Sequence, residues 1–281
     1  MARLAGHNAP PDDVLGGAGQ RGYTRIMDDD ALLDLAADLA RRAGAVILAI
    51  RARGFETLRK ADASPVTEAD HAAEALILEG LRGAAPHIPA IAEEEMEAGH
   101  RHACGSEYWL VDPLDGTREF AALRDEFTVN IGLIRDGRPV LGVVGVPAYG
   151  ELFGGMLGDS PRAWKRTGAG ERPIRARTPP PEGIHVLASR HYAQDPHLGA
   201  FLQGRTVAAV TNMGSALKIV RVAEGAGDLY PRFGRTMEWD TAGPQAVLEA
   251  AGGRLCTMDG AALGYGKPGW ENPPFVCTGV P

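Results

Sequence analysis

The chain has 281 residues, 44% of them apolar and 23% charged, which is ordinary for a soluble globular protein and ample for a full core. Its formal net charge of −7 argues against a nucleic-acid polymer as a partner, since proteins that bind one carry a strongly basic surface. No apolar run approaches the length of a transmembrane helix, so no integral membrane segment is expected.

The three cysteines, Cys104, Cys256 and Cys277, are widely spaced and form no C-x-x-C pair. This spacing argues against a disulfide framework or a zinc site and fits a reducing, cytoplasmic compartment. Residues 1–25 are rich in Gly, Ala, Pro and Asp and lack the apolar segment of a secretory signal. We expect them to form a flexible tail without a role in chemistry.

Two helices are predicted next along the chain. Apolar residues recur at helical spacing over residues 28–53, which predicts an amphipathic helix with acidic residues at its N-terminus. Thr67 followed by Asp70 is a capping signal for a second helix. On the residues alone, Asp70 is an acid at a helix N-terminus, and Lys60 and Asp62 are solvated loop charges.

Two short apolar runs then end in acidic residues. Residues 88–92 lead directly into Glu93 and Glu94, and residues 108–111 lead into Asp112. A run of charges is usually a solvated face of the protein. Here, however, both groups of acids follow the end of an apolar run, which places them at the ends of predicted buried strands.

The segment D-P-L-D-G-T after the second run predicts a tight turn. Pro113 has no N–H to donate and should end the strand, and Gly116 permits a backbone conformation that other residues resist. The turn would gather Asp112, Asp115 and the Thr117 hydroxyl, hard oxygen ligands of the kind that Mg²⁺ takes alongside waters and substrate phosphate. An ordinary Asp-rich turn is the alternative.

The following residues predict a scaffold of strands. Residues 127–134 and 139–144 flank Asp136 and Gly137, a strong signal for a β-hairpin. A further strand over residues 151–155 would extend the hairpin into an antiparallel meander. Three prolines at 179–181 then mark a boundary between two halves of the chain.

Beyond this boundary, residues 184–188 form a predicted strand that ends at Ser189, and residues 207–210 form another. The second strand leads into Gly214 and Ser215 at a helix start, where free N–H groups could bind an anion; an ordinary serine cap is the alternative. Asp240 opens a later helix, as an N-cap on the residues alone. Closing strands are expected over residues 254–257 and 275–278.

Three strings resemble, in the same order, the signatures of the Mg²⁺-dependent, lithium-sensitive phosphatases related to inositol monophosphatase. They are K-x-D-x-S-P-V-T-x-A-D at 60–70, D-P-L-D-G-T-R-E-F at 112–120 and W-D-x-A-G at 239–243. The Glu-Phe ending of the second string, and Y-P-R-F-G at 230–234, are most similar to the 3′(2′),5′-bisphosphate nucleotidase branch of that family.

The resemblance covers nearly the whole chain beyond the tail and implies an α+β fold, an αβαβα layered sandwich. Its N-terminal half would hold the antiparallel meander sheet and its C-terminal half a smaller mixed sheet. We therefore expect an N-terminal α+β domain over residues 26–178 that carries the metal site, and a C-terminal α/β domain over residues 183–281 that completes it.

The resemblance also implies the roles of individual residues. Two or three Mg²⁺ ions would be held by the side chains of Glu93, Asp112, Asp115 and Asp240 and by the Leu114 carbonyl. Asp70 and Thr117 would together orient and deprotonate the attacking water, without a phosphoenzyme. Glu94 would lie near the site, and Lys60 and Asp62 would position a loop that contributes to a metal site.

The substrate contacts implied by the family are Gly116, Thr117, Ser189, Gly214, Ser215, Lys218, Arg232 and Asp240. Lys218 and Arg232 are expected on the phosphate that is not cleaved, since a guanidinium suits a phosphate. The nucleotidase pattern usually reads S-R-S-H, whereas this chain reads S-R-H-Y, so a contact from His191 departs from the pattern. Phe233 stands where the inositol-specific branch has a carboxylate.

The leading prediction is hydrolysis of the 3′-phosphate of 3′-phosphoadenosine 5′-phosphate, and of its phosphosulfate, to AMP and phosphate. One alternative is an inositol monophosphatase or a fructose 1,6-bisphosphatase-like sugar phosphatase. Another is a non-catalytic nucleotide or metal sensor. The expected partner is the small-molecule nucleotide bisphosphate, and the chain is expected to be a monomer or a homodimer.

Overall fold

A computed structural model describes residues 1–2, 27–60, 65–100, 105–190 and 196–280 of the chain. The predictions for Asp62, for His191 and for most of the tail lie outside the described residues. None of the helices in the described part combines the length and the apolar character needed to cross a bilayer.

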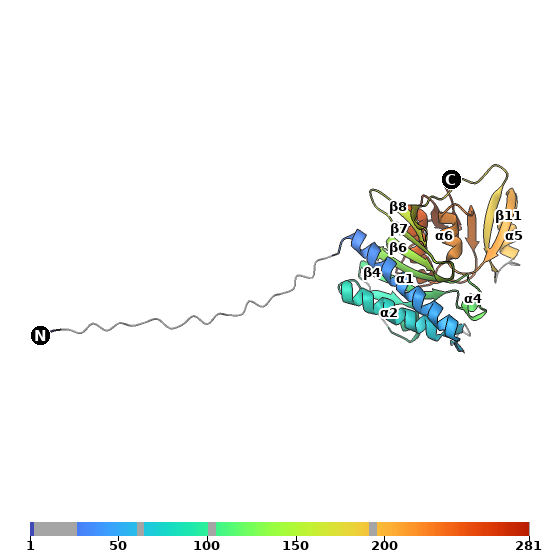
Figure 1. Cartoon of the computed structure of the whole chain (residues 1–281). Coiled ribbons are helices and arrows are strands. Elements are labelled where there is room, and N and C mark those ends of the chain that lie inside the picture. The colour runs from blue at the N-terminus through green and yellow to red at the C-terminus, as the bar shows by residue number, and fades with distance from the viewer. Residues whose placement is uncertain (3–26, 61–64, 101–104, 191–195, 281) are drawn as a thin grey trace.

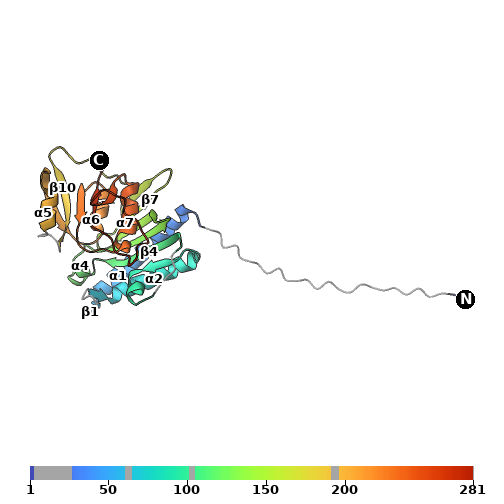
Figure 2. The ribbon, with the colours of Figure 1, turned by 180° about the vertical axis from the view of Figure 1, so that it is seen from behind.

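The elements stack in five alternating layers, which confirms the predicted αβαβα sandwich. Helices α1 (Asp29–Arg53) and α2 (Glu68–Ala84) pack their apolar faces on one side of a seven-stranded sheet (Figure 1). Helices α6 (Leu217–Ala223) and α7 (Glu238–Ala250) lie between this sheet and a five-stranded sheet (Figure 2). Helix α5 (Pro196–Leu202) packs on the outer face of the five-stranded sheet.

The seven-stranded sheet contains the predicted meander, with two further antiparallel strands at one edge and a parallel strand at the other. In spatial order its strands are β3 (Ala90–Ala92), β4 (Glu107–Asp115), β5 (Thr128–Arg135), β6 (Arg138–Val146), β7 (Glu151–Met156), β8 (Arg162–Thr167) and β9 (Gly170–Pro173). Only β3 and β4 run parallel. Asp136 and Gly137 both have positive φ, 51° and 72°, as the tight turn between β5 and β6 requires.

The five-stranded sheet is mixed, as predicted for the second half. Its spatial order is β11 (Val207–Met213), β10 (Ile184–Ser189), β12 (Leu229–Arg232), β14 (Phe275–Thr278) and β13 (Arg254–Thr257). Strand β10 is parallel to both of its neighbours, and β14 is antiparallel to both of its own.

Several short elements were not expected from the sequence. A two-stranded sheet joins β1 (Thr57–Arg59) to β2 (Pro65–Thr67), and three single turns of helix follow at α3 (Glu93–Glu97), α4 (Thr117–Ala121) and η1 (Pro147–Tyr149). Helix α7 packs across β5, β6 and β7 of the first sheet. The division into domains at residues 179–182 therefore stays a prediction.

The predicted end of the strand at Pro113 is wrong. Strand β4 continues to Asp115, with Asp112 opposite Asn130 and Asp115 opposite Thr128 on β5. Three steps along β4 thus match two steps along β5, which is a β-bulge. A bulge leaves one residue unpaired, and this is how a proline without an N–H is accommodated inside a strand.

Glycines let helix α7 approach the seven-stranded sheet closely. A Cβ on Gly132 would lie 2.5 Å from the Gly243 nitrogen, and one on Gly142 would lie 2.5 Å from the Gly243 Cα. The sheet and the helix therefore meet backbone against backbone at this point. This contact sets the position of the N-terminal turn of α7, which carries Asp240.

Candidate active site

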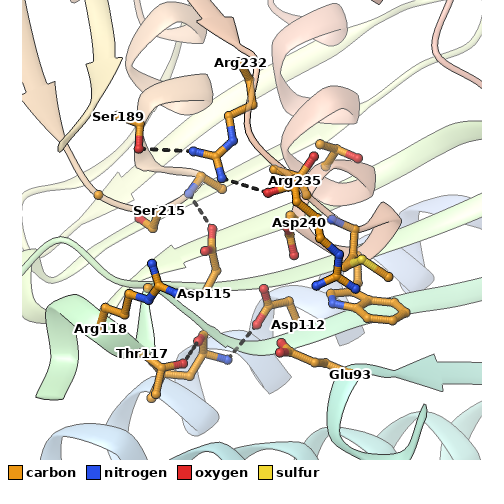
Figure 3. A pocket seen from close by; sticks show the side chains of 18 of the residues that line it. Glu93, Asp112, Asp115, Thr117, Arg118, Ser189, Ser215, Arg232, Arg235 and Asp240 are labelled. Carbon is orange, nitrogen blue, oxygen red and sulfur yellow. Dashed lines mark hydrogen bonds between the residues drawn. The ribbon is translucent and has the colours of Figure 1, made fainter. Parts of the chain in front are cut away.

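A cavity of about 990 Å³ lies where the two halves of the chain meet. Its walls come from the start of α3, the turn between β4 and α4, the turn before α6, strand β12 and the start of α7 (Figure 3). Elements from both sheets are thus needed to enclose it. Of the residues predicted from the sequence, those that line it are Glu93, Asp112, Leu114, Asp115, Gly116, Thr117, Ser189, Gly214, Ser215, Lys218, Arg232 and Asp240.

Four carboxylates from three segments converge on this cavity. Because Ala92 on β3 pairs with Val111 on the parallel strand β4, Glu93 and Asp112 follow paired residues and emerge side by side. Asp115 follows on the far side of the bulge in β4, and Asp240 comes from the first turn of α7. The sequence predicted these four acids as metal ligands, and the fold brings all of them to one cavity.

The proximity of the carboxylates changes their protonation. Burial raises the pKa of Asp112 well above its usual range, and the charges of Glu93, Asp115 and Asp240 raise it further. Burial raises the pKa of Asp240 to about 8, again with repulsion from neighbouring acids. These groups cannot all be ionised together without positive charge among them. A set of hard oxygen ligands that requires a counter-charge fits Mg²⁺.

Backbone contacts hold the bulge of β4 in shape. The Leu114 N–H donates to Asp112 Oδ1 at 3.0 Å, and the Ala216 N–H donates to Asp115 Oδ2 at 2.5 Å. Gly116 has φ of 93°, and a Cβ there would meet the Glu126 carbonyl oxygen at 3.0 Å. The two aspartates are thus fixed by their own turn and by the turn before α6.

Asp70 caps helix α2 and also contacts Thr117. Its Oδ2 accepts hydrogen bonds from the Thr67 N–H at 2.8 Å and the Thr67 hydroxyl at 2.7 Å, which caps α2. Its Oδ1 lies 3.1 Å from Thr117 Oγ1, which is also 3.1 Å from the Leu114 carbonyl oxygen. The carboxylate is 1% exposed, and burial raises its pKa. A nearly buried acid therefore contacts a hydroxyl in the cavity wall.

Lys60 is not a solvated loop charge. Its Nζ lies 2.9 Å from Glu93, 2.6 Å from Glu94 and 2.8 Å from Glu97. Burial by itself lowers the pKa of Lys60, but these carboxylates outweigh burial and raise it above its ordinary value. Lys60 is therefore a counter-charge for Glu93 and its neighbours, and Glu94 lies beside the cavity rather than in its lining.

Sequence reasoning missed Glu74, which fixes the start of α3 and thereby the position of Glu93. Both Glu74 carboxylate oxygens accept backbone N–H bonds at the start of α3, from Glu94 at 2.8 Å and from Glu95 at 2.9 Å. Its spacing from Asp70 in the sequence could have revealed it. Glu74 lies one helical turn after Asp70, so an inward-facing Asp70 predicts an inward-facing Glu74.

The turn before α6 differs from the prediction. Helix α6 begins at Leu217, and two N–H groups of the turn already donate to carboxylates: Gly214 to Glu126 at 3.0 Å, and Ala216 to Asp115. The predicted free N–H groups are therefore not found at these two positions, because carboxylates of the protein already accept both hydrogen bonds. Ser215 has φ of 49°, and its Oγ accepts the Leu217 N–H two residues on. The N-cap of α6 is Ala216 and has no side-chain cap, so the alternative of an ordinary serine cap is wrong.

The two predicted phosphate contacts are both engaged with the protein. Lys218 is 2% exposed, and its Nζ donates to the carbonyl oxygens of Met213 at 3.1 Å and Ser215 at 2.6 Å. Burial lowers its pKa to about 8. Arg232 donates to Ser189 Oγ at 3.1 Å and to the Gly234 and Arg235 carbonyl oxygens at 3.2 and 2.9 Å.

Two further arginines line the cavity and had no predicted role. Arg235 forms an ion pair with Glu271 at 3.2 Å, and Arg118 is exposed at the first turn of α4. Arg118 directly follows the D-G-T segment, so its place beside the site could have been read from the sequence.

Comparisons with known proteins identify the family and several relatives of this chain. The sequence model of the inositol monophosphatase family matches residues 28–276. The 3′(2′),5′-bisphosphate nucleotidase CysQ of Salmonella typhimurium is 42% identical over 250 residues, which cover 88% of this chain and 99% of the relative. The CysQ nucleotidase of Escherichia coli K12 is 40% identical over 247 residues, which cover 87% and 98%.

Solved structures show the same likeness. CysQ from Bacteroides thetaiotaomicron, described as a bacterial member of the inositol monophosphatase family, superposes with a TM-score of 0.73 at 32% identity, covering 89% of this chain and 97% of that one. An inositol monophosphatase from Anabaena superposes with a TM-score of 0.70 at 28% identity, covering 89% and 91%.

Proposed function

The chain belongs to the inositol monophosphatase family, and from this premise we propose that it is a metal-dependent 3′(2′),5′-bisphosphate nucleotidase. It would hydrolyse the 3′-phosphate of 3′-phosphoadenosine 5′-phosphate, and of the corresponding phosphosulfate, to AMP and phosphate. The observation that carries the reaction type is the convergence of four carboxylates in one cavity whose wall includes Thr117, which contacts the buried Asp70. The names of the nucleotidase relatives at 40–42% identity favour this substrate.

The proposed cofactor is Mg²⁺, two or three ions per site. Glu93, Asp112, Asp115 and Asp240 would hold it, together with the Leu114 carbonyl. When bound, these ions would supply positive charge that stabilises the phosphate oxygens as the bond to the ribose breaks. The raised pKa values of Asp112 and Asp240 support this proposal, since a cation relieves the repulsion that raises them.

The proton of the attacking water would leave through Thr117 and Asp70. With its own proton directed to Asp70 Oδ1, the Thr117 hydroxyl keeps a lone pair that can accept a hydrogen bond from water in the cavity. As the water oxygen bonds to phosphorus, its proton passes to Thr117 and that of Thr117 to Asp70. The P–O bond to the ribose breaks, and the 3′ oxygen takes a proton from solvent. Both Thr67 contacts hold Asp70 in position for this transfer.

Two alternatives remain from the sequence. A sugar phosphatase would use the same carboxylates, and it would differ only in the part of the cavity that holds the rest of the substrate. A non-catalytic sensor would bind metal and nucleotide but needs no hydroxyl beside a buried acid, so the Asp70–Thr117 contact argues against it.

The test is phosphate release by the purified protein with Mg²⁺. The substrates 3′-phosphoadenosine 5′-phosphate, inositol 1-phosphate and fructose 1,6-bisphosphate are compared, each with and without lithium. We expect the highest kcat/KM for the nucleotide, inhibition by lithium and no turnover after chelation of the metal. A higher kcat/KM for a sugar phosphate would favour the first alternative. Nucleotide binding without turnover would favour the sensor.

A further inference from the structure

Four basic side chains line the cavity: Arg118, Lys218, Arg232 and Arg235. Three of them have protein partners. Lys218 donates to two backbone carbonyls, Arg232 donates to Ser189 and two carbonyls, and Arg235 pairs with Glu271. A cation that already contacts the protein gains less from a ligand, because it must give up or share its contacts.

Arg118 differs from these three. It is exposed, and within the part of the chain that the structure describes its guanidinium has neither a hydrogen-bond nor an ion-pair partner. Figure 3 shows its side chain on the same side of the cavity as Ser215, beside Asp115 and Thr117. It is therefore the cation of the cavity wall that can engage a ligand without losing a described contact.

Arg118 faces a different part of the cavity from Thr117, which lies beside the proposed site of phosphate hydrolysis. Successive residues of a helix point about 100° apart, so Thr117 and Arg118 on α4 cannot face the same point. Thr117 faces the buried Asp70, whereas Arg118 reaches solvent at the rim. A phosphate beside Thr117 and a phosphate beside the Arg118 guanidinium would therefore occupy different parts of the cavity.

The backbone just before Arg118 is held against the turn before α6. Asp115 accepts the Ala216 N–H, and a Cβ on Gly116 would lie only 3.2 Å from Ser215 Cβ. The turn that carries Arg118 is therefore packed against the turn before α6. A guanidinium that starts from a fixed backbone loses less freedom when it binds than one on a mobile loop.

We propose that Arg118 binds the non-reacting phosphate of the bisphosphate substrate and so sets the preference for bisphosphates over monophosphates. This inference rests on the proposed function. A guanidinium can pair with a phosphate through two parallel hydrogen bonds, and with a net charge of −7 the protein needs a local cation to attract a second phosphate. Lys218 and Arg232 would then shape the wall, and Arg118 would make the specific contact.

The test compares Arg118→Ala with the wild type on two substrates that share the reacting 3′-phosphate. These are 3′-phosphoadenosine 5′-phosphate and adenosine 3′-monophosphate, which lacks the second phosphate. We expect Arg118→Ala to lower kcat/KM for the bisphosphate by about 10- to 100-fold, mainly through KM, and to leave the monophosphate nearly unchanged. Arg118→Lys should recover part of the loss, since lysine keeps the positive charge but cannot form the two parallel hydrogen bonds of a guanidinium.

The matched control is Arg124→Ala, which removes an exposed arginine close by in the chain that does not line the cavity. It should leave both substrates unaffected. An equal loss on both substrates with Arg118→Ala, or no loss on the bisphosphate, would overturn the inference while the wild-type activity upholds the proposed function. A wild type that releases no phosphate from the bisphosphate would overturn the proposed function and this inference together.

Discussion

Two lysines with little exposed side chain, Lys60 beside the acidic wall of the cavity and Lys218 in another wall, have opposite surroundings. Lys60, on the acidic side, lies within 3 Å of three carboxylates, and its pKa is raised above the ordinary value. Lys218, on the side of the turn before α6, donates to two carbonyls and lies over the Tyr230 ring, and burial lowers its pKa to about 8. The surroundings of a lysine, and not burial alone, decide its pKa.

This difference shows that the two lysines have different roles at the site. On the acidic side a lysine balances carboxylates that a metal ion would also bind, so Lys60 and the metal act on the same charges. On the other side Lys218 holds backbone carbonyls together and has little exposed surface. Lys60 therefore balances negative charge, whereas Lys218 holds the turn before α6 in its conformation.

The largest expected effect is that of Asp115→Asn, because Asp115 belongs to both sides. It lines the cavity with the other carboxylates and also accepts the Ala216 N–H. Asparagine keeps an oxygen for that N–H but removes the charge, so we expect activity to fall by more than about 100-fold while Tm changes little. Phosphate release and thermal unfolding measure the two effects.

The matched control for this variant is Asp125→Asn, which alters an exposed aspartate paired with Arg51 outside the cavity. It should keep full activity. Turnover by Asp115→Asn at the wild-type rate would remove Asp115 from the proposed metal ligands.

The next effect tests the acidic side alone. Lys60→Met leaves Glu93, Glu94 and Glu97 without their shared counter-charge, which should lower the free energy of unfolding of the metal-free protein by about 2–3 kcal/mol. This figure is below that for a fully buried pair, because the Glu97 side chain is 37% exposed. Saturating Mg²⁺ should restore part of the loss through Glu93. Denaturant unfolding with and without Mg²⁺ measures both; a loss that Mg²⁺ does not reduce would contradict the shared role.

A third effect is the pH dependence of the metal-free protein. The pKa of Asp240 rises from an ordinary value of 3.8 to about 8 in the folded chain, so the folded state holds a proton that the unfolded state has lost. Stability from this group is complete below pH 3.8 and is lost as the pH rises toward 8. Thermal scans without metal should show Tm falling by a few degrees between about pH 5 and 8, and Mg²⁺ should flatten the curve. A Tm that rises over this range would be inconsistent with the cluster.

The smallest expected effect is that of Lys218→Met, the counterpart of Lys60→Met. It removes two hydrogen bonds but also the cost of burying a charge, so we expect a loss of about 1 kcal/mol that Mg²⁺ does not restore. The same denaturant unfolding measures it. If this variant lost more stability than Lys60→Met, the contrast between the two sides would be reversed.

Local signals made much of the molecule predictable. The hairpin at Asp136-Gly137 and the helix at residues 29–53 follow from turn chemistry and periodicity. The set of four acids was implied only by the resemblance of short strings to a known family. Contacts between distant segments were not predictable in this way. The three partners of Lys60 and the burial of Lys218 depend on how far one element packs from another, which no string of adjacent residues encodes.

The bulge at Pro113 shows the same limit on a smaller scale. The residue type correctly indicated a break in hydrogen bonding, but whether the strand stops or bulges depends on the partner strand β5. Asn130 and Thr128 continue the ladder there, and so Asp112 and Asp115 share one strand instead of flanking a turn.

Gly132, Gly142 and Gly243 do not line the cavity, yet the distance between α7 and the sheet depends on them. A methyl group at any of the three would push the helix outward and carry Asp240 away from Asp112. In a saturation screen scored by activity, these buried glycines would tolerate as few replacements as the carboxylates do. The three glycines that set the spacing of the acids would therefore be as intolerant of mutation as the acids themselves.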